Sequence, residues 1–143
     1  MNNHPETFKL LLLIAFIAQA LIDLLGITGF YYRMYPEEIF QHSGHGAVLT
    51  FQTTFSLYLL WMATYYLSII AMAIKHPISW IIVPLVLLLS FVQQPISGVY
   101  IGTPFEATIG WIGWVAYIMA ISMLLFSSEV AQTFRKGISE AQE

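Results

Sequence analysis

The sequence contains no cysteine and very little charge. Charged residues make up 9% of its 143 residues, against about 25% in an ordinary soluble domain. The absence of cysteine excludes disulfide frameworks, thiolate nucleophiles and iron–sulfur clusters. Five basic residues stand against eight acidic ones, for a net charge of -3, so the chain is not expected to bind nucleic acid. No nucleophile signature or glycine-rich phosphate loop occurs, so hydrolase and nucleotide chemistry have no support.

Apolar residues, by contrast, are in large excess. They make up 58% of the chain, and the mean hydropathy is +0.74. About 20 apolar residues in a helix are enough to cross the ~30 Å hydrocarbon core of a bilayer. Four stretches meet this condition, namely residues 10–31, 48–74, 78–100 and 105–127. We therefore predict an all-α, polytopic four-helix transmembrane bundle that forms one domain over residues 1–143, with the lipid bilayer as its solvent.

The basic residues predict how the bundle is oriented. Lys9 precedes the first stretch, Lys75 separates the second from the third, and Arg135 and Lys136 follow the fourth, whereas only Arg33 lies on the other side. Because basic residues collect on the cytoplasmic side of a membrane, both termini are predicted to be cytoplasmic. No small-residue cleavage site closely follows the first apolar run, so we expect this helix to be retained and not removed as a signal peptide.

Two short polar segments predict where helices turn and begin. Lys75 and the residue after it leave room only for a tight turn between the second and third spans. Pro77 suits the first position of a helix, where its missing N–H would have no partner in any case. Thr103 and Glu106 have the spacing of a capping box, which would begin the fourth span.

Polar side chains within the predicted spans indicate a candidate site. Gln19 and Asp23 are four residues apart and so share one face of the first helix. Asp23 lies roughly 21 Å beyond Lys9 along the helix axis, in the outer half of the membrane, because a helix rises about 1.5 Å per residue. Glutamines of the second and third spans are expected at a similar depth, around an outer-half cavity that binds a ligand. The predicted ligand-binding residues are Gln19, Asp23, Gln52, Gln93, Gln94 and Trp61.

Each of these residues also has a purely structural interpretation. The glutamines can hydrogen-bond one helix to another, and Trp61 and Tyr58 can simply fill the core. Asp23 is the stronger functional candidate, since acids at membrane depth are costly and usually functional. A polar stripe on the second span is predicted to face the other helices, and two glycines on the fourth span permit close helix approach. These residues are Thr50, Thr54, Trp61, Thr64 and Ser68 in the stripe, and Gly110 and Gly113 on the fourth span.

The segment between the first two spans holds a weak metal-like pattern. His42 and His45 are three residues apart and lie close to Glu37 and Glu38. Such residues can bind zinc or iron, but this spacing does not supply four assured ligands. We therefore predict no metal and no cofactor, and keep a metal-dependent membrane redox enzyme using His42, His45 and Glu38 only as an alternative.

Several short segments resemble the EXPERA family, the four-span membrane proteins that include the sigma-2 receptor and the emopamil-binding sterol isomerase. The segments are residues 22–24, residues 35–38, and Lys75 with the Trp-Ile and proline of residues 80–84. The resemblance implies that Asp23 matches the acid that pairs with a cationic amine or a developing carbocation. It also implies sterol-like or amine ligands and double-bond isomerisation. The family's second acid, in span two, has no counterpart between Gln52 and Tyr58, and isomerisation needs a paired proton donor and acceptor.

These observations together predict an integral membrane protein that binds a hydrophobic small molecule, either sterol-like or amine-bearing, in an outer-half cavity around Asp23. Isomerase activity is left open. The first alternative is a non-catalytic accessory subunit, which would use the face of Gly110 and Gly113 to contact a larger membrane complex. A homodimer is compatible with either interpretation.

Overall fold

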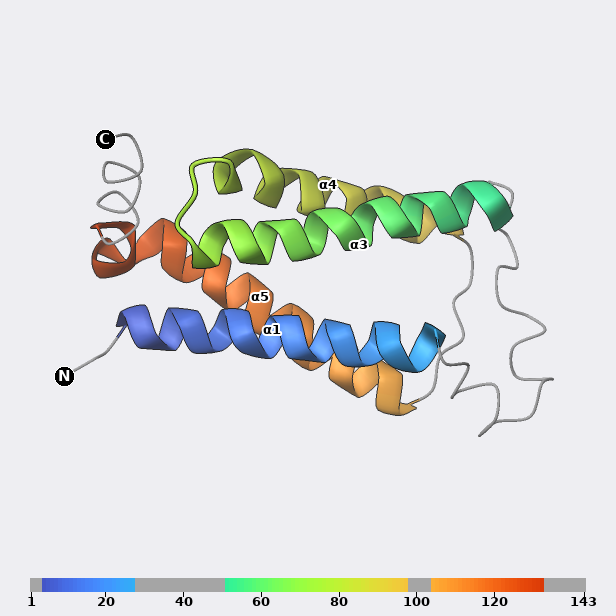
Figure 1. The fold of residues 1–143 in the computed structure, drawn as a ribbon, viewed down its shortest axis with the longest axis horizontal. Helices are drawn as coiled ribbons and strands as arrows, with labels where there is room; N and C mark the ends of the chain where they lie inside the picture. Colours follow the sequence, from blue (N-terminus) through green and yellow to red (C-terminus); the bar gives the residue numbers. More distant parts are fainter. Residues whose placement is uncertain (1–3, 28–50, 98–103, 133–143) are drawn as a thin grey trace.

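The computed structural model of the chain describes residues 4–27, 51–97 and 104–132, and the regular structure in these ranges is helical. The helices are α1 (His4–Ile27), α3 (Phe51–Ala73), α4 (Ser79–Ser97) and α5 (Pro104–Phe126). They run alternately in opposite directions, so that α1 begins at the end of the bundle where α5 finishes (Figure 1). At that end the side chains of His4 and Ser127 lie 3.5 Å apart.

The helices coincide with the apolar stretches of the sequence. Three segments are long and apolar enough to cross a membrane, namely His4–Leu25, Phe55–Ala73 and Pro104–Phe126. A shorter apolar helical segment covers Ser79–Val92. The prediction of an all-helical chain with several candidate spans is therefore confirmed. The fourth crossing, and the side of the membrane on which the termini lie, stay predictions.

Small residues let α1 and α5 approach closely. A Cβ atom added at Gly113 would lie 3.0 Å from the Cβ atom of Ala18, and one at Gly110 would lie 3.5 Å from Ile22. Because the glycines have no side chain, the backbones of the two helices can pack at this short distance. The glycine face is thus used within the chain, and helices α1 and α5 form one closely packed pair while α3 and α4 form the other.

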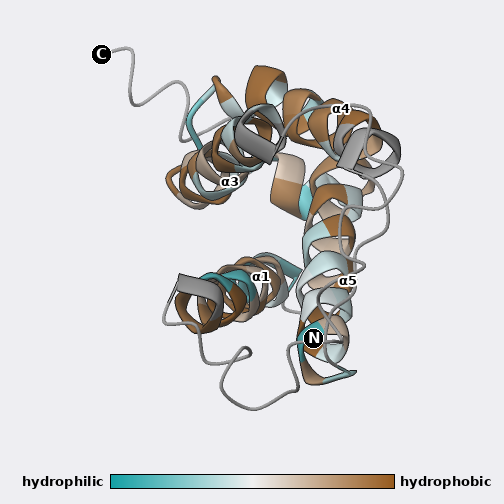
Figure 2. Cartoon of the chain, turned by 90° about the vertical axis from the view of Figure 1, so that its right-hand side faces the viewer, coloured by the Kyte–Doolittle hydropathy of each residue, from teal (hydrophilic) through white to brown (hydrophobic). Residues whose placement is uncertain are grey.

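Aromatic side chains from α3 connect the two helix pairs. The ring of Trp61 lies 6.2 Å from that of Trp114 on α5, and the rings of Tyr65 and Tyr117 lie 4.8 Å apart. The Tyr117 hydroxyl is also 2.7 Å from the hydroxyl of Ser68. Each such ring pair contributes about 0.5–1.5 kcal/mol beyond its burial. The end view in Figure 2 shows the α3 ribbon set apart from that of α1. The ring contacts given above join α3 to α5.

The turn between α3 and α4 has a Schellman geometry. The His76 N–H donates to the Ala71 carbonyl at 2.8 Å, and the Lys75 N–H donates to the Met72 carbonyl at 3.2 Å. Lys75 takes the left-handed position of this motif, with a φ of 58°, a position at which glycine is the usual residue. The predicted tight hairpin is therefore present, but α4 begins at Ser79, so Pro77 lies in the turn before the helix and not at its first position.

The outer surface of the bundle is apolar. Large hydrophobic side chains point outward along every helix, including Trp111, which is 73% exposed, and Phe91, which is 80% exposed. Brown, hydrophobic ribbon accordingly dominates the helices in Figure 2. An apolar surface of this extent is costly in water and suits contact with lipid.

Candidate functional site

The Asp23 carboxylate lies between α1 and α3 and accepts three hydrogen bonds. On its own helix, the Gln19 side-chain amide donates to Oδ1 at 2.9 Å. From α3, the Tyr58 hydroxyl donates to the same oxygen at 2.6 Å, and the Tyr66 hydroxyl donates to Oδ2 at 2.5 Å. The Asp23 side chain is half-buried, whereas Gln19 is buried.

Helix geometry explains why these donors converge. Gln19 precedes Asp23 by one turn, so the two side chains stand on one face of α1. Across the gap, the ring of Tyr66 packs edge-on against Phe16 at a centroid distance of 5.3 Å. The ring of Tyr58 stacks on Trp61 at 5.8 Å. With their rings held in this way, both phenols reach Asp23 from positions on α3 that are about 12 Å apart along the helix axis.

No cationic side chain among the described residues neutralises Asp23. All three of its hydrogen-bond donors are uncharged. The two described lysines, Lys9 and Lys75, lie at the other end of the bundle, where α1 begins and α3 finishes. A carboxylate has about four acceptor positions, of which the described donors fill three. An acid within an apolar helix that could cross a membrane is expensive when it has no cationic partner.

The wall of the site next to Tyr58 is aromatic and firmly held. The Trp61 indole N–H donates to the Ser90 hydroxyl on α4 at 2.8 Å. This bond satisfies the only donor of the Trp61 side chain, and the ring stacks on Tyr65 at 5.4 Å. The faces of such rings attract cations while their bodies contact apolar groups. The site therefore combines an anion with an adjoining aromatic surface.

The structure assembles part of the predicted residue set. Gln19 contacts Asp23 directly, and Trp61 contacts Asp23 only indirectly, through its stacking on Tyr58. Helices α3 and α4 contain Gln52, Gln93 and Gln94, but the side chains of these glutamines lie outside the described residues, so their place in the site stays a prediction.

The metal hypothesis concerned His42, His45, Glu37 and Glu38, all of which lie outside the described residues. Within the helices and connections that the structure does describe, no group of three or more His, Cys, Asp or Glu side chains could hold a metal ion. The capping box is only half described, because α5 begins at Pro104 while Thr103 lies outside those ranges.

The tyrosine donors to Asp23 were not predicted from the sequence. The sequence indicates Tyr58 only as a possible core residue and does not distinguish Tyr66. A signal does exist, since Tyr58, Trp61 and Tyr65 recur at helical spacing on one face of α3, with Tyr66 beside them. Hydroxyl groups on such a face suit a polar partner on the neighbouring helix.

Two cavities occur in the described part of the chain, and neither is lined by Asp23. One has a volume of about 190 Å³ and lies at the end of the bundle that carries Lys9 and Lys75. The other, of about 230 Å³, is an apolar groove on the outside of α1 and α5, lined by residues such as Ile17 and Ile112. In this conformation the described side chains around Asp23 are packed on one another.

Comparison with known proteins adds no relative: no family model, curated protein or solved structure matches this chain. The fold and the arrangement around Asp23 are accordingly the basis for any functional conclusion.

Proposed function

We propose that this chain is a multi-pass membrane protein that binds a hydrophobic ligand with a cationic amine head, and that Asp23 is the anion that holds the amine. The observation that carries the proposal is the Asp23 carboxylate, which has three neutral hydrogen-bond donors and no cation beside it among the described residues. The wider topology proposed with it is four spans with both termini cytoplasmic.

The groups around Asp23 favour one class of ligand. An ammonium group would occupy the remaining acceptor position of Asp23 and neutralise its charge. The face of Tyr58 or Trp61 would add a cation–π contact of about 0.5–2 kcal/mol. An apolar body, sterol-like or aliphatic, would then lie among the exposed hydrophobic side chains that line the outer surfaces of the helices.

The proposal is limited to binding. The resemblance of short segments to the EXPERA family stays an expectation, which implies an amine or sterol-like ligand at Asp23. Isomerisation would require a second proton-transferring group, and the sequence of α3 contains no acid. Tyr58 and Tyr66 both donate to Asp23 and act in this account as positioning residues, because they hold the carboxylate in place between the helices.

A matched pair of probes tests the proposal. Purified protein in a non-ionic detergent is unfolded by heat in the presence of dodecylamine or of dodecanol, which has the same chain without the charge. A ligand at about 100 times its dissociation constant adds roughly 2.7 kcal/mol to the stability of the folded state. We expect dodecylamine to raise the midpoint of unfolding and dodecanol to raise it much less.

Two variants distinguish charge from packing. Asp23→Asn keeps the shape of the side chain and removes its charge, so we expect dodecylamine to bind about 10- to 150-fold more weakly, the loss expected for a charged hydrogen bond of ~1.5–3 kcal/mol. Tyr65→Phe removes a hydroxyl on the same helix that bonds to the Ala15 carbonyl and not to Asp23, so amine binding should be retained. Equal stabilisation of wild type and Asp23→Asn would show that Asp23 is only a structural link between α1 and α3.

A further inference from the structure

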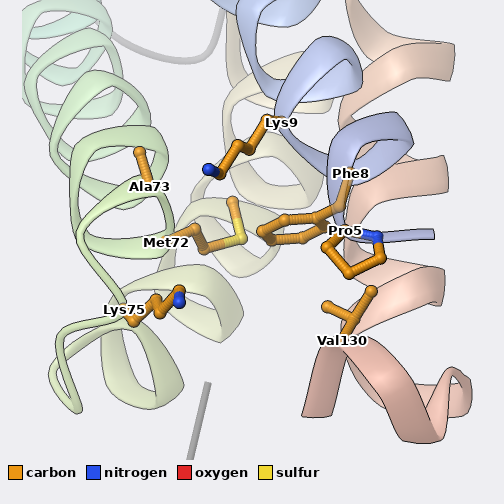
Figure 3. Close-up of a pocket in the computed structure, with 7 residues that line it drawn as sticks. All are labelled: Pro5, Phe8, Lys9, Met72, Ala73, Lys75 and Val130. Atoms are coloured by element: carbon orange, nitrogen blue, oxygen red, sulfur yellow. The ribbon is translucent and has the colours of Figure 1, made fainter. Parts of the chain in front are cut away.

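A second candidate site lies at the opposite end of the bundle from Asp23. A cavity of about 190 Å³ opens where α1 begins, where α3 finishes and where the chain continues beyond α5. Figure 3 shows Lys9 reaching from α1 toward α3, and Lys75 reaching from the end of α3 toward α1. Its lining includes Pro5, Phe8, Lys9, Met72, Lys75 and Val130.

The floor of this cavity is apolar and firmly packed. Met72 and Val130 are almost fully buried, at 0% and 1% exposure, and Phe8 is buried between them. These three side chains come from three separate parts of the chain and belong to one hydrophobic core cluster. The cavity is therefore bounded by side chains whose positions are determined by the core, and not by loosely held surface groups.

The rim, in contrast, is positively charged. Lys9 and Lys75 both line the cavity, and none of its described lining residues is acidic. The described acids closest to it in the sequence, Glu6 and Glu129, are exposed and do not contribute to the lining. Neither lysine has a carboxylate partner among residues 4–27, 51–97 and 104–132. Two ammonium groups over an apolar floor are complementary to an amphiphile with an anionic head.

Lys75, which carries one of these charges, has an unusual backbone conformation. Its φ of 58° lies in the left-handed region, which is disfavoured for residues that carry a Cβ atom. Glycine or asparagine usually occupies this position of a helix end. Here a lysine occupies it, and its side chain extends over the cavity (Figure 3).

The position and the volume of the cavity indicate which kind of anionic molecule binds there. Both lysines border the apolar spans, since Lys9 is followed by Leu10 and Lys75 is preceded by Ile74, and these two neighbours are 55% and 65% exposed. This is the depth of lipid headgroups, where basic pockets between membrane helices bind acidic lipids. A volume of about 190 Å³ is smaller than the ~300–1,000 Å³ of sites that enclose a whole small molecule, but it can hold a phosphate and the adjoining part of a lipid whose chains remain in the bilayer.

We infer that this cavity binds the phosphate headgroup of an anionic membrane phospholipid between Lys9 and Lys75. This site is separate from Asp23, so phospholipid binding at the two lysines does not depend on amine binding at Asp23.

Phosphatidylglycerol serves as the anionic probe and phosphatidylcholine as the zwitterionic one. Each is titrated onto the full chain in non-ionic detergent, and the lipid retained is counted by native mass spectrometry.

We expect phosphatidylglycerol to bind more tightly than phosphatidylcholine. Lys75→Gly removes one charge and at the same time suits the left-handed backbone, so the fold is retained and any loss is a loss of binding. Lys9→Gln removes the other charge from an exposed position. A lysine near a membrane surface adds about five-fold in affinity for acidic lipid, so each variant should bind phosphatidylglycerol about five-fold more weakly and the double variant about 25-fold more weakly.

Two controls make the outcome decisive. Arg33→Gln also removes one positive charge, but from the segment that joins α1 to α3, whose ends lie at the other end of the bundle; its phosphatidylglycerol affinity should be unchanged. Glycerophosphoglycerol, which is the same phosphodiester headgroup without the acyl chains, should not displace the lipid. Equal affinity for the two lipids, an equal loss in Arg33→Gln, or displacement by glycerophosphoglycerol would each overturn the inference.

Discussion

The phenol bonds to Asp23 give the most quantitative prediction. Tyr58 and Tyr66 donate to its carboxylate at 2.6 and 2.5 Å, and they join α1 to α3, two helices that otherwise have few contacts. A hydrogen bond to a charged group contributes about 1.5–3 kcal/mol, whereas a neutral bond between membrane helices averages about 0.6 kcal/mol. Each Tyr→Phe change should therefore cost ~1.5–3 kcal/mol in wild type and ~0.6 kcal/mol in Asp23→Asn. The difference is a coupling energy of about 0.9–2.4 kcal/mol.

The assay is a double-mutant cycle in mixed micelles. Protein in a non-ionic detergent is titrated with sodium dodecyl sulfate, and unfolding is followed by tryptophan fluorescence. Trp61 and Trp114 are good reporters, because their stacked rings separate when α3 and α5 come apart. The free energy of unfolding is compared for the wild type, the two single Tyr→Phe variants, Asp23→Asn and the two corresponding double variants.

Tyr65→Phe is the matched control. Tyr65 lies on the same helix, but its hydroxyl meets the Ala15 carbonyl at 3.4 Å, too long for a strong bond. Its removal should cost less than about 0.5 kcal/mol and should be additive with Asp23→Asn. Coupling energies below about 0.5 kcal/mol for both Tyr58 and Tyr66 would refute the view that these phenols stabilise a charged Asp23.

Three further predictions concern packing and the turn. Gly113→Leu should lower the free energy of unfolding by at least ~1–3 kcal/mol, because even a Cβ atom there lies 3.0 Å from Ala18; unchanged stability in the same titration would contradict the close α1–α5 approach. Trp61→Phe should cost about 1 kcal/mol by removing the bond to Ser90, and a loss of the same size in a Ser90→Ala background would show that this bond is not the cause. Lys75→Gly should raise the midpoint of thermal unfolding, by the equivalent of about 1 kcal/mol, because glycine suits a φ of 58°; a lowered midpoint would contradict this.

Hydropathy predicts much of the fold because each helix must satisfy its own backbone in lipid. The helices accordingly lie on the apolar stretches, although α1 begins at His4, within the polar segment that precedes the first stretch. The close approach at Gly110 and Gly113 was also predictable, since only small residues allow it. Which helix packs against these glycines was not predictable, because hydropathy does not specify which helices pair. In the structure the glycines pack on α1 of the same chain.

Local helix geometry made part of the candidate site predictable. Gln19 and Asp23 share a face through local helix geometry, and the structure shows them hydrogen-bonded. The donors from α3 depend on the rotation and axial offset of two separate helices, which a single sequence does not encode locally. From the sequence alone Tyr58 is therefore only a candidate core residue and Tyr66 is not distinguished, whereas the structure shows both bonded to Asp23.

Binding of an amine by the charged Asp23 side chain can be tested on two proteins side by side. The midpoint of thermal unfolding is measured with and without dodecylamine for wild type and for Asp23→Asn, in the same non-ionic detergent. We expect a clear rise for wild type, equivalent to roughly 2.7 kcal/mol at about 100 times the dissociation constant, and little or no rise for Asp23→Asn. An equal rise in the two proteins, or no rise in wild type, would contradict this expectation.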